Sequence, residues 1–252
     1  YIVSLGTTGE TATLTAAEKQ SIWEFTSETA NGRIKLVAGI GGNDTRVVGK
    51  QIRDFSVKGF SAVLSVSPYY SKPTQEGIYQ HYKYLSEHSD LPLILYNVPG
   101  RTGSSISAET TCRLANDLKN VIATKEASAN FDQFNQILRD KPAGFDVISG
   151  DDPITLPMMA MGAIGVISVV GNALPRMYSD MVRDCMDGDF KKASLAHLKM
   201  IEFTSLLFQE GNPAGIKSAL KTLGICQDYV RLPLVKASEQ LGSKISHSIG
   251  AL

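Results

Sequence analysis

Residues 121–128 run Val-Ile-Ala-Thr-Lys-Glu-Ala-Ser, an apolar stretch that ends in a lysine. The apolar part predicts a short strand that is covered on both faces, as in parallel sheets. Lys125 would follow it where a loop begins, with its stem emerging from an apolar interior. Desolvation there disfavours an ammonium group and favours the free amine that attacks carbonyls. By itself, however, the stretch fits a solvated lysine at a strand end better than a nucleophile.

The same kind of run recurs along the chain, alternating with longer segments of helical period. This alternation predicts a parallel sheet covered by helices. Thr15 with Glu18 three residues later predicts a capping-box start for the first helix. The expected strands are 2–5, 34–38, 62–66, 93–96, 121–124, 145–148 and 165–169, and the expected helices are 15–31, 43–56, 74–88, 105–117, 130–140, 152–161 and 175–187.

Seven strand-helix units are visible, one short of the eight in a TIM (β/α)8 barrel. The chain begins inside an expected strand, so we expect that the first strand-helix unit is missing from it. A doubly wound open sheet is the competing architecture, but no strand is followed by a Gly-x-Gly-x-x-Gly or P-loop motif. From about residue 189 only helical segments follow, at 189–209, 213–223 and 232–248. We therefore expect a barrel over 1–188 and a C-terminal helical domain over 189–252.

The composition is that of an ordinary globular protein, with 43% hydrophobic residues and 25 basic against 25 acidic side chains. This balance gives no reason to expect nucleic acid or an anionic membrane as partner. No apolar run approaches the length of a membrane span, so a cytoplasmic location is expected. Three widely spaced cysteines and four histidines within helical segments predict neither disulfides nor a metal site.

Side chains with chemical potential follow several of the expected strands. Thr7 and Thr8, between glycines, offer hydroxyls and amides for a carboxylate, although a turn with a helix cap explains them equally well. Tyr96 can relay protons at a strand end, or can be a core tyrosine. Arg101, in a Pro-Gly loop, can hold a carboxylate bidentately, or can simply be solvated.

Three acidic residues have less specific interpretations. Asp151 and Asp152 open an expected helix, where acidic residues are favoured by the helix dipole alone, so we expect a structural role for both. Glu126 either orients the loop after Lys125 or points to solvent. A lysine, a phenol, two hydroxyls and an arginine at one rim nevertheless suit Schiff-base chemistry on a keto acid, with no cofactor and no metal.

Six motifs in order then make the pattern specific. They are Gly-Thr-Thr-Gly-Glu at 6–10, Pro-Tyr-Tyr at 68–70, Tyr-Asn-Val-Pro-Gly-Arg-Thr at 96–102, Lys-Glu-Ala-Ser at 125–128, Ser-Gly-Asp-Asp at 149–152 and Gly-Val-Ile-Ser-Val at 165–169. Nearly end to end, the chain resembles the dihydrodipicolinate synthase family of the pyruvate-dependent class I aldolases. Ala129 departs from the glycine that often follows the lysine motif in this family.

The resemblance implies a role for each matching residue. Lys125 would form the Schiff base with pyruvate, and Tyr96, Thr7 and Tyr70 would relay protons, with Tyr70 reaching the site of a neighbouring subunit. Further residues would bind the substrates pyruvate and L-aspartate 4-semialdehyde. These are Thr8 on the pyruvate carboxylate, Arg101 on the carboxylate of the semialdehyde, and Gly150 and Ile167 through their backbone.

The resemblance also implies a TIM barrel with a helical domain, a homotetramer built as a dimer of dimers, and a product of the lysine and diaminopimelate route, 4-hydroxy-tetrahydrodipicolinate. Arg101 favours this reaction over those of N-acetylneuraminate lyases and ketodeoxygluconate aldolases, which stay open as alternatives. A barrel that binds a keto acid without turnover is the third hypothesis. Ala16, Lys19 and Val47 replace polar residues of lysine-inhibited members, so lysine inhibition is not expected.

Overall fold

The computed structural model describes residues 1–252 and contains one sheet of six parallel strands. The strands lie side by side in their sequence order, so each connection leads to the strand next to the one it leaves. This confirms the predicted parallel α/β fold. The strands are β1 (Ile2–Ser4), β2 (Leu36–Gly39), β3 (Phe60–Val66), β4 (Leu93–Asn97), β5 (Val121–Glu126) and β6 (Asp146–Ser149).

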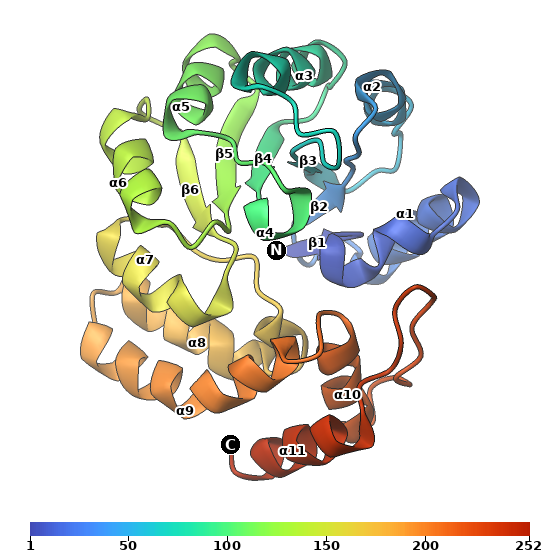
Figure 1. The fold of residues 1–252 in the computed structure, drawn as a ribbon, viewed down its shortest axis with the longest axis vertical. Helices are drawn as coiled ribbons and strands as arrows, with labels where there is room; N and C mark the ends of the chain where they lie inside the picture. Colours follow the sequence, from blue (N-terminus) through green and yellow to red (C-terminus); the bar gives the residue numbers. More distant parts are fainter. The chain divides into compact units, whose positions relative to one another are not determined.

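Helices connect these strands, and the four longer ones after β2 to β5 follow one another around the sheet (Figure 1). Thr15 and Glu18 form the predicted capping box of the first helix, with Thr15 N donating to Glu18 Oε2 over 2.8 Å. The helices are α1 (Ala16–Ala30), α2 (Thr45–Arg53), α3 (Gln75–Glu87), the short α4 (Pro99–Thr102), α5 (Ala108–Asp117) and α6 (Phe131–Asp140).

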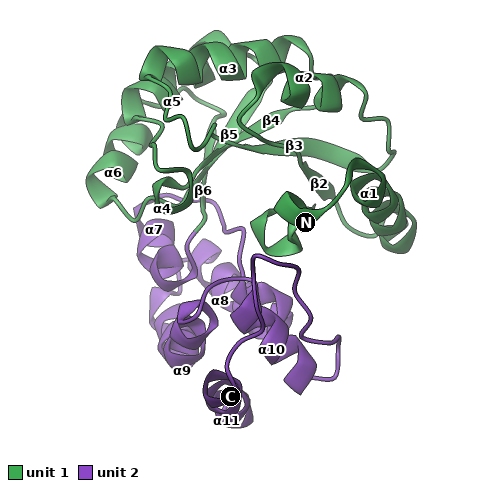
Figure 2. Cartoon of the chain, turned by 45° about the vertical axis from the view of Figure 1, so that its right-hand side comes forward, with its two compact units in different colours: residues 1–150 green, residues 151–252 purple.

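The chain divides into two compact units, residues 1–150 and residues 151–252 (Figure 2). The first unit holds the sheet, and the second is helical. This division follows how compactly the chain packs and not where the barrel ends. The predicted boundary between barrel and helical domain after residue 188 therefore stays a prediction. The second unit contains α7 (Thr155–Met161), α8 (Pro175–Met186), α9 (Phe190–Phe208), α10 (Ala214–Thr222) and α11 (Glu239–Gly250).

Two predicted elements were wrong. Residues 165–169 form no strand, because only Val166 makes a bridge before the chain turns into the 3-10 helix η4 (Val170–Asn172). The last helix begins at Glu239, and not near residue 232, with Ser238 as its N-cap.

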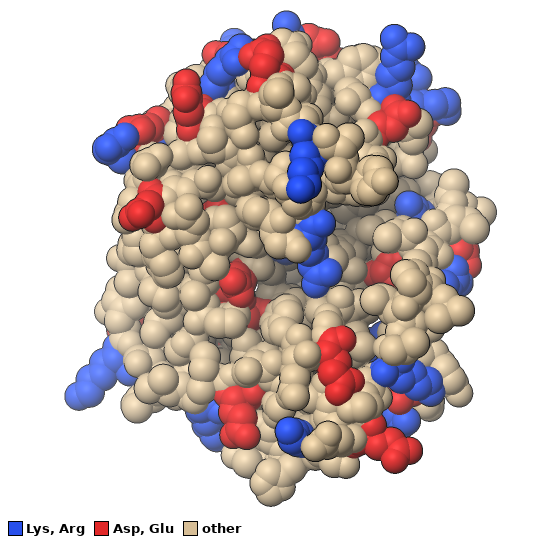
Figure 3. Space-filling model, viewed as in Figure 1, with Lys and Arg blue, Asp and Glu red and all other residues tan.

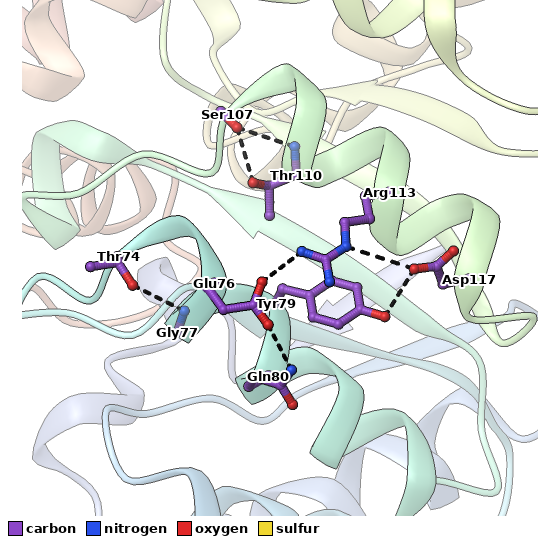
Figure 4. Close-up of polar contacts among 9 residues, drawn as sticks. All are labelled: Thr74, Glu76, Gly77, Tyr79, Gln80, Ser107, Thr110, Arg113 and Asp117. Carbon is purple, nitrogen blue, oxygen red and sulfur yellow. Dashed lines mark hydrogen bonds and ion pairs between the residues drawn. The ribbon is translucent and has the colours of Figure 1, made fainter.

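An aromatic and charged cluster fastens α3 to α5. The guanidinium of Arg113 on α5 lies 3.5 Å from the ring centroid of Tyr79 on α3 and pairs with Glu76 over 2.7 Å (Figure 4). Tyr79 in turn donates to Asp117 over 2.9 Å. Tyr79 is buried, whereas Glu76, Arg113 and Asp117 are exposed, so the cluster joins two neighbouring helices from the core outward.

The surface agrees with the balanced composition. Acidic and basic side chains are interspersed on the face seen in Figure 3. None of the helices combines the length and the apolarity that a membrane crossing requires.

His81 is a buried titratable group in the helical layer. Its Nδ1 lies 2.8 Å from Thr45 Oγ1, its Nε2 is enclosed without a partner, and its ring packs edge-on against Tyr82. Burial lowers the pKa of His81 from 6.5 to about 4. The folded chain therefore keeps this imidazole neutral at pH values where the unfolded chain protonates it.

Acidification should consequently destabilise the first unit. Above the unfolded pKa of 6.5 both states are neutral, and as pH falls from there toward about 4 only the unfolded state gains a proton. We expect His81 to lower the free energy of unfolding by about 2 kcal/mol between about pH 7 and about pH 5. Urea unfolding followed by the fluorescence of Trp23, the only tryptophan, measures this. His81→Gln should show a loss smaller by that amount; an equal loss in both proteins would contradict the assignment.

Candidate active site

Lys125 and Tyr96 are register partners on the neighbouring strands β5 and β4. Lys125 Nζ lies 4.2 Å from the centroid of the Tyr96 ring. Both side chains are buried, with exposed fractions of 8% and 6%. The structure therefore brings together the predicted nucleophile and the predicted proton-relay phenol through the hydrogen-bond ladder of the sheet itself.

The amine of Lys125 has no hydrogen-bond or ion-pair partner within the chain. Its one polar contact is the face of the Tyr96 ring, which attracts an ammonium only weakly compared with a carboxylate. Burying an ammonium without a counter-ion is costly, and buried lysines are almost always paired. A contribution to stability therefore does not explain an unpaired amine at this depth.

Gly150 makes room for the lysine. An added Cβ at this position would lie 2.8 Å from Lys125 Cε and 2.7 Å from Ala127 Cβ, both closer than such atoms approach one another. The Gly150 amide donates to the Glu126 carbonyl over 2.8 Å, which fixes the backbone after β6 against β5. Of the predicted site residues, Gly150 is thus the second one in contact with Lys125.

Thr7 and Thr8 lie in the 3-10 turn η1 (Thr7–Gly9) after β1, and both are partly buried. Just before this turn the backbone of Leu5 lies in close contact with Gly39 of β2. A Cβ on that glycine would lie 2.2 Å from the Leu5 carbonyl oxygen. Leu5 itself adopts a φ of 59°, which turns the chain sharply at the end of the strand. The two hydroxyls therefore come from a tightly held turn at the carboxyl edge of the sheet.

Arg101 is carried by α4, directly after β4. Pro99 starts this helix in the position that proline favours, and Gly103 ends it with a φ of 72°. Arg101 is exposed and has no acidic partner within the chain. A free guanidinium one turn beyond Tyr96 is available for an anionic ligand.

Tyr70 differs from the other predicted site residues in its exposure. It follows β3 with 89% of its surface exposed and a φ of 71°, a left-handed conformation that bulky residues seldom adopt. The ring is thus held away from the body of its own unit. Tyr70 shares the carboxyl edge of the sheet with Lys125 but does not contact it.

Ile167 belongs to the second unit, within the segment that was predicted to be a strand. The buried carboxylate of Asp152 accepts hydrogen bonds from the amides of Val169, over 2.8 Å, and Val170, over 3.3 Å. Asp152 also accepts, through its carbonyl, from the Tyr178 hydroxyl. The predicted structural role of Asp152 is therefore a clamp on the turn that follows Ile167.

β5 continues through Glu126, two residues beyond its predicted end. Glu126 is 2% exposed and accepts hydrogen bonds from the side-chain amide of Asn97, its register partner on β4. This rules out the interpretation that Glu126 points to solvent. The role of Asn97 was not predicted. Asn97 directly follows Tyr96 just as Glu126 directly follows Lys125, and these equivalent positions could have indicated that the two residues are partners.

The parallel α/β fold and the unpaired lysine buried against a tyrosine agree with the expected class, an aldolase-type lyase of class I. Comparison with known proteins is consistent with this class. The chain belongs to the dihydrodipicolinate synthetase family, whose model matches residues 1–252.

Individual relatives agree with the family assignment. The 4-hydroxy-tetrahydrodipicolinate synthase of Phocaeicola vulgatus is 53% identical over 235 residues, which cover 93% of this chain and 79% of the relative. Dihydrodipicolinate synthase from Aquifex aeolicus has a crystal structure with a TM-score of 0.96, at 40% identity over 99% of this chain and 85% of that one. The chloride-inhibited enzyme from Acinetobacter baumannii, complexed with pyruvate, has a TM-score of 0.95 at 37% identity, with 99% and 86% covered.

Proposed function

We propose that this chain condenses pyruvate with L-aspartate 4-semialdehyde through a Schiff base on Lys125, giving 4-hydroxy-tetrahydrodipicolinate. The observation that carries the proposal is the buried, unpaired amine of Lys125 against the Tyr96 ring. The family membership supports the reaction, and the pyruvate complex of the Acinetobacter baumannii relative supports the first substrate.

The chemistry starts from the free amine. Lys125 Nζ attacks the ketone carbon of pyruvate, and loss of water gives the Schiff base. Loss of a proton from the methyl carbon gives an enamine, which attacks the aldehyde of the semialdehyde. The amino group of that substrate then closes the ring and displaces Lys125, so one water is lost overall. No step requires an oxidant, a reductant or a metal.

The remaining residues move protons and hold carboxylates. We assign the proton transfers to Tyr96, Thr7 and Tyr70, the carboxylate of pyruvate to Thr7 and Thr8, and a place in the lining of the pyruvate pocket to the backbone of Gly150. The partly buried turn of Thr7 and Thr8 supports this assignment. In the same proposal Ile167 lines the pyruvate pocket through its backbone.

We also propose the finer points of the fold and assembly. The six parallel strands in sequential order support a (β/α)8 barrel, with its barrel part in 1–188 and a helical domain in 189–252. The exposed, left-handed Tyr70 supports a homotetramer built as a dimer of dimers, in which this ring enters a neighbouring site. A cytoplasmic location completes the proposal.

Arg101 tests which aldehyde is used. Replacing it by alanine should raise the KM for L-aspartate 4-semialdehyde about 10- to 100-fold, because one charged hydrogen-bonding partner of the carboxylate is lost. Formation of the pyruvate adduct should stay within about twofold of wild type. Arg101→Lys should recover only part of the loss, since a lysine lacks the planar bidentate fork.

Steady-state assays with the semialdehyde and with other aldehydes separate the alternatives. Arg46→Ala, an exposed arginine on α2, is the matched control and should behave as wild type. A KM for the semialdehyde that Arg101→Ala leaves unchanged would favour a different pyruvate-dependent aldolase. Pyruvate binding without turnover of any aldehyde would favour a keto-acid-binding protein.

A further inference from the structure

Glu126 is a buried carboxylate that is satisfied entirely by neutral donors. Asn97 Nδ2 donates to both oxygens over 3.1 and 3.0 Å, Ser128 N donates over 2.7 Å and Gln133 Nε2 over 2.9 Å. No cation pairs with it within the chain. Because an unmet buried charge is very unfavourable, these donors are tightly constrained to their positions.

Asn97 extends this network to the loop that carries Arg101. Its Oδ1 accepts from Ile106 N over 3.0 Å and lies 3.4 Å from the hydroxyl of Ser105. The backbone adds a further link, since Ala127 N donates to the Asn97 carbonyl over 2.9 Å. The side chain of Asn97 therefore joins the end of β5 to the last two residues of the segment 98–106.

The strand register relates this network to the reactive pair. Asn97 pairs with Glu126, and the preceding residues Tyr96 and Lys125 pair with each other. Successive side chains of a strand point to opposite faces, so the two pairs lie back to back on the same two strands. Fixing the first pair fixes the spacing and the relative rotation of the second.

We propose that Asn97 and Glu126 are positioning residues for the reaction, which hold Lys125 against Tyr96 from the opposite face of the sheet. This inference rests on the proposed function, because it presumes that the amine of Lys125 reacts with pyruvate. It adds that the geometry of the amine depends on a hydrogen-bonded pair that does not touch the substrate. The same pair sets the position of the loop that bears Arg101.

Three nearly isosteric variants test the pair. Glu126→Gln replaces an acceptor oxygen by a donor that faces the Asn97 amide, and Asn97→Asp places two carboxylates face to face. The double variant, Asn97→Asp with Glu126→Gln, exchanges donor and acceptor at the contact with Glu126 Oε2, whereas the contact with Oε1 becomes one between two acceptor oxygens. It keeps the acceptors for Ile106 N and Ser128 N, and a flipped Gln133 amide satisfies the new one.

The readouts are the rate at which borohydride traps a pyruvyl adduct, seen by intact mass, and KM and kcat for each substrate. Each single variant should slow adduct formation about 10- to 100-fold, as small displacements of a reacting group do. The KM for the semialdehyde should rise as well, because the loop of Arg101 is released. The double variant should recover part of the adduct rate, because one of the two contacts across the pair regains a donor and an acceptor.

Controls separate positioning from folding and from the proposed function. Ile137→Val removes a buried methyl group from the neighbouring α6 and should leave the adduct rate unchanged. Thermal unfolding establishes that each variant is folded at the assay temperature. Wild-type rates in both single variants, or a double variant no faster than the slower single one, would overturn the inference. Failure of the wild type to form any adduct would instead refute the proposed function.

Discussion

Lys125→Met should abolish trapping of pyruvate and reduce product formation at least about a thousandfold, because a thioether cannot form the Schiff base. Methionine fills nearly the same volume and has no proton to transfer. The effect should be on kcat and on the adduct, because the groups that bind the substrates are untouched. Intact mass after borohydride treatment, together with a product assay, measures both.

The same substitution should leave the fold as stable as before, or more stable by about 1 to 2 kcal/mol. The reason is that the amine of Lys125 is buried without a hydrogen-bond or ion-pair partner, whereas a methionine side chain of similar volume needs none. Urea unfolding gives the comparison. Lys119→Ala, an exposed lysine just before the same strand, is the control and should change neither activity nor adduct. Persistent adduct in Lys125→Met would refute the assignment of the nucleophile.

Gly150→Ala should slow adduct formation about a hundredfold, although it adds only one methyl group. That methyl would lie 3.0 Å from Lys125 Cγ, 2.8 Å from Cε and 2.7 Å from Ala127 Cβ. The lysine stem can rotate away, but the Ala127 methyl cannot, since it is attached directly to the backbone. Displacement of the amine by about 1 Å is sufficient for a loss of this size.

The destabilisation in Gly150→Ala should be modest, about 1 to 3 kcal/mol, as for other overpacked sites. The adduct rate and the free energy of unfolding are therefore both needed. Gly250→Ala is the matched control, because a Cβ there meets nothing within 4 Å and lies at the far end of the chain. A wild-type adduct rate in Gly150→Ala would contradict the contact between Gly150 and the lysine stem.

Much of the first unit could be predicted from the sequence because its strands are short, apolar and separated by clear helix starts. The failures have local causes. The strand of Lys125 was ended too early because ionised residues are rare inside sheets, and only tertiary structure reveals that Asn97 satisfies Glu126. The segment around Ile167 is apolar enough for a strand, yet it makes a single bridge, and pairing partners cannot be deduced from composition.

The predicted site residues show the same division. The register pairing of Lys125 with Tyr96 follows from their places at neighbouring strand ends. The family resemblance did not predict the backbone conformation of Ala129. Its φ of 56° is one that glycine favours. The alanine at this position therefore carries a backbone strain of about 1 to 2 kcal/mol.

Lys125 and Tyr96 are paired within the sheet, so the reaction with the keto acid and the choice of aldehyde depend on different parts of the chain. In the proposed reaction the first chemical step depends on atoms that the sheet holds in place, whereas the second substrate would meet a side chain on the short helix α4, which follows β4. Variation within residues 98–103 can therefore alter which aldehyde is accepted while the reaction with the keto acid continues unchanged. The scaffold is in this sense modular, and that loop is the natural place to begin redesign of its acceptor range.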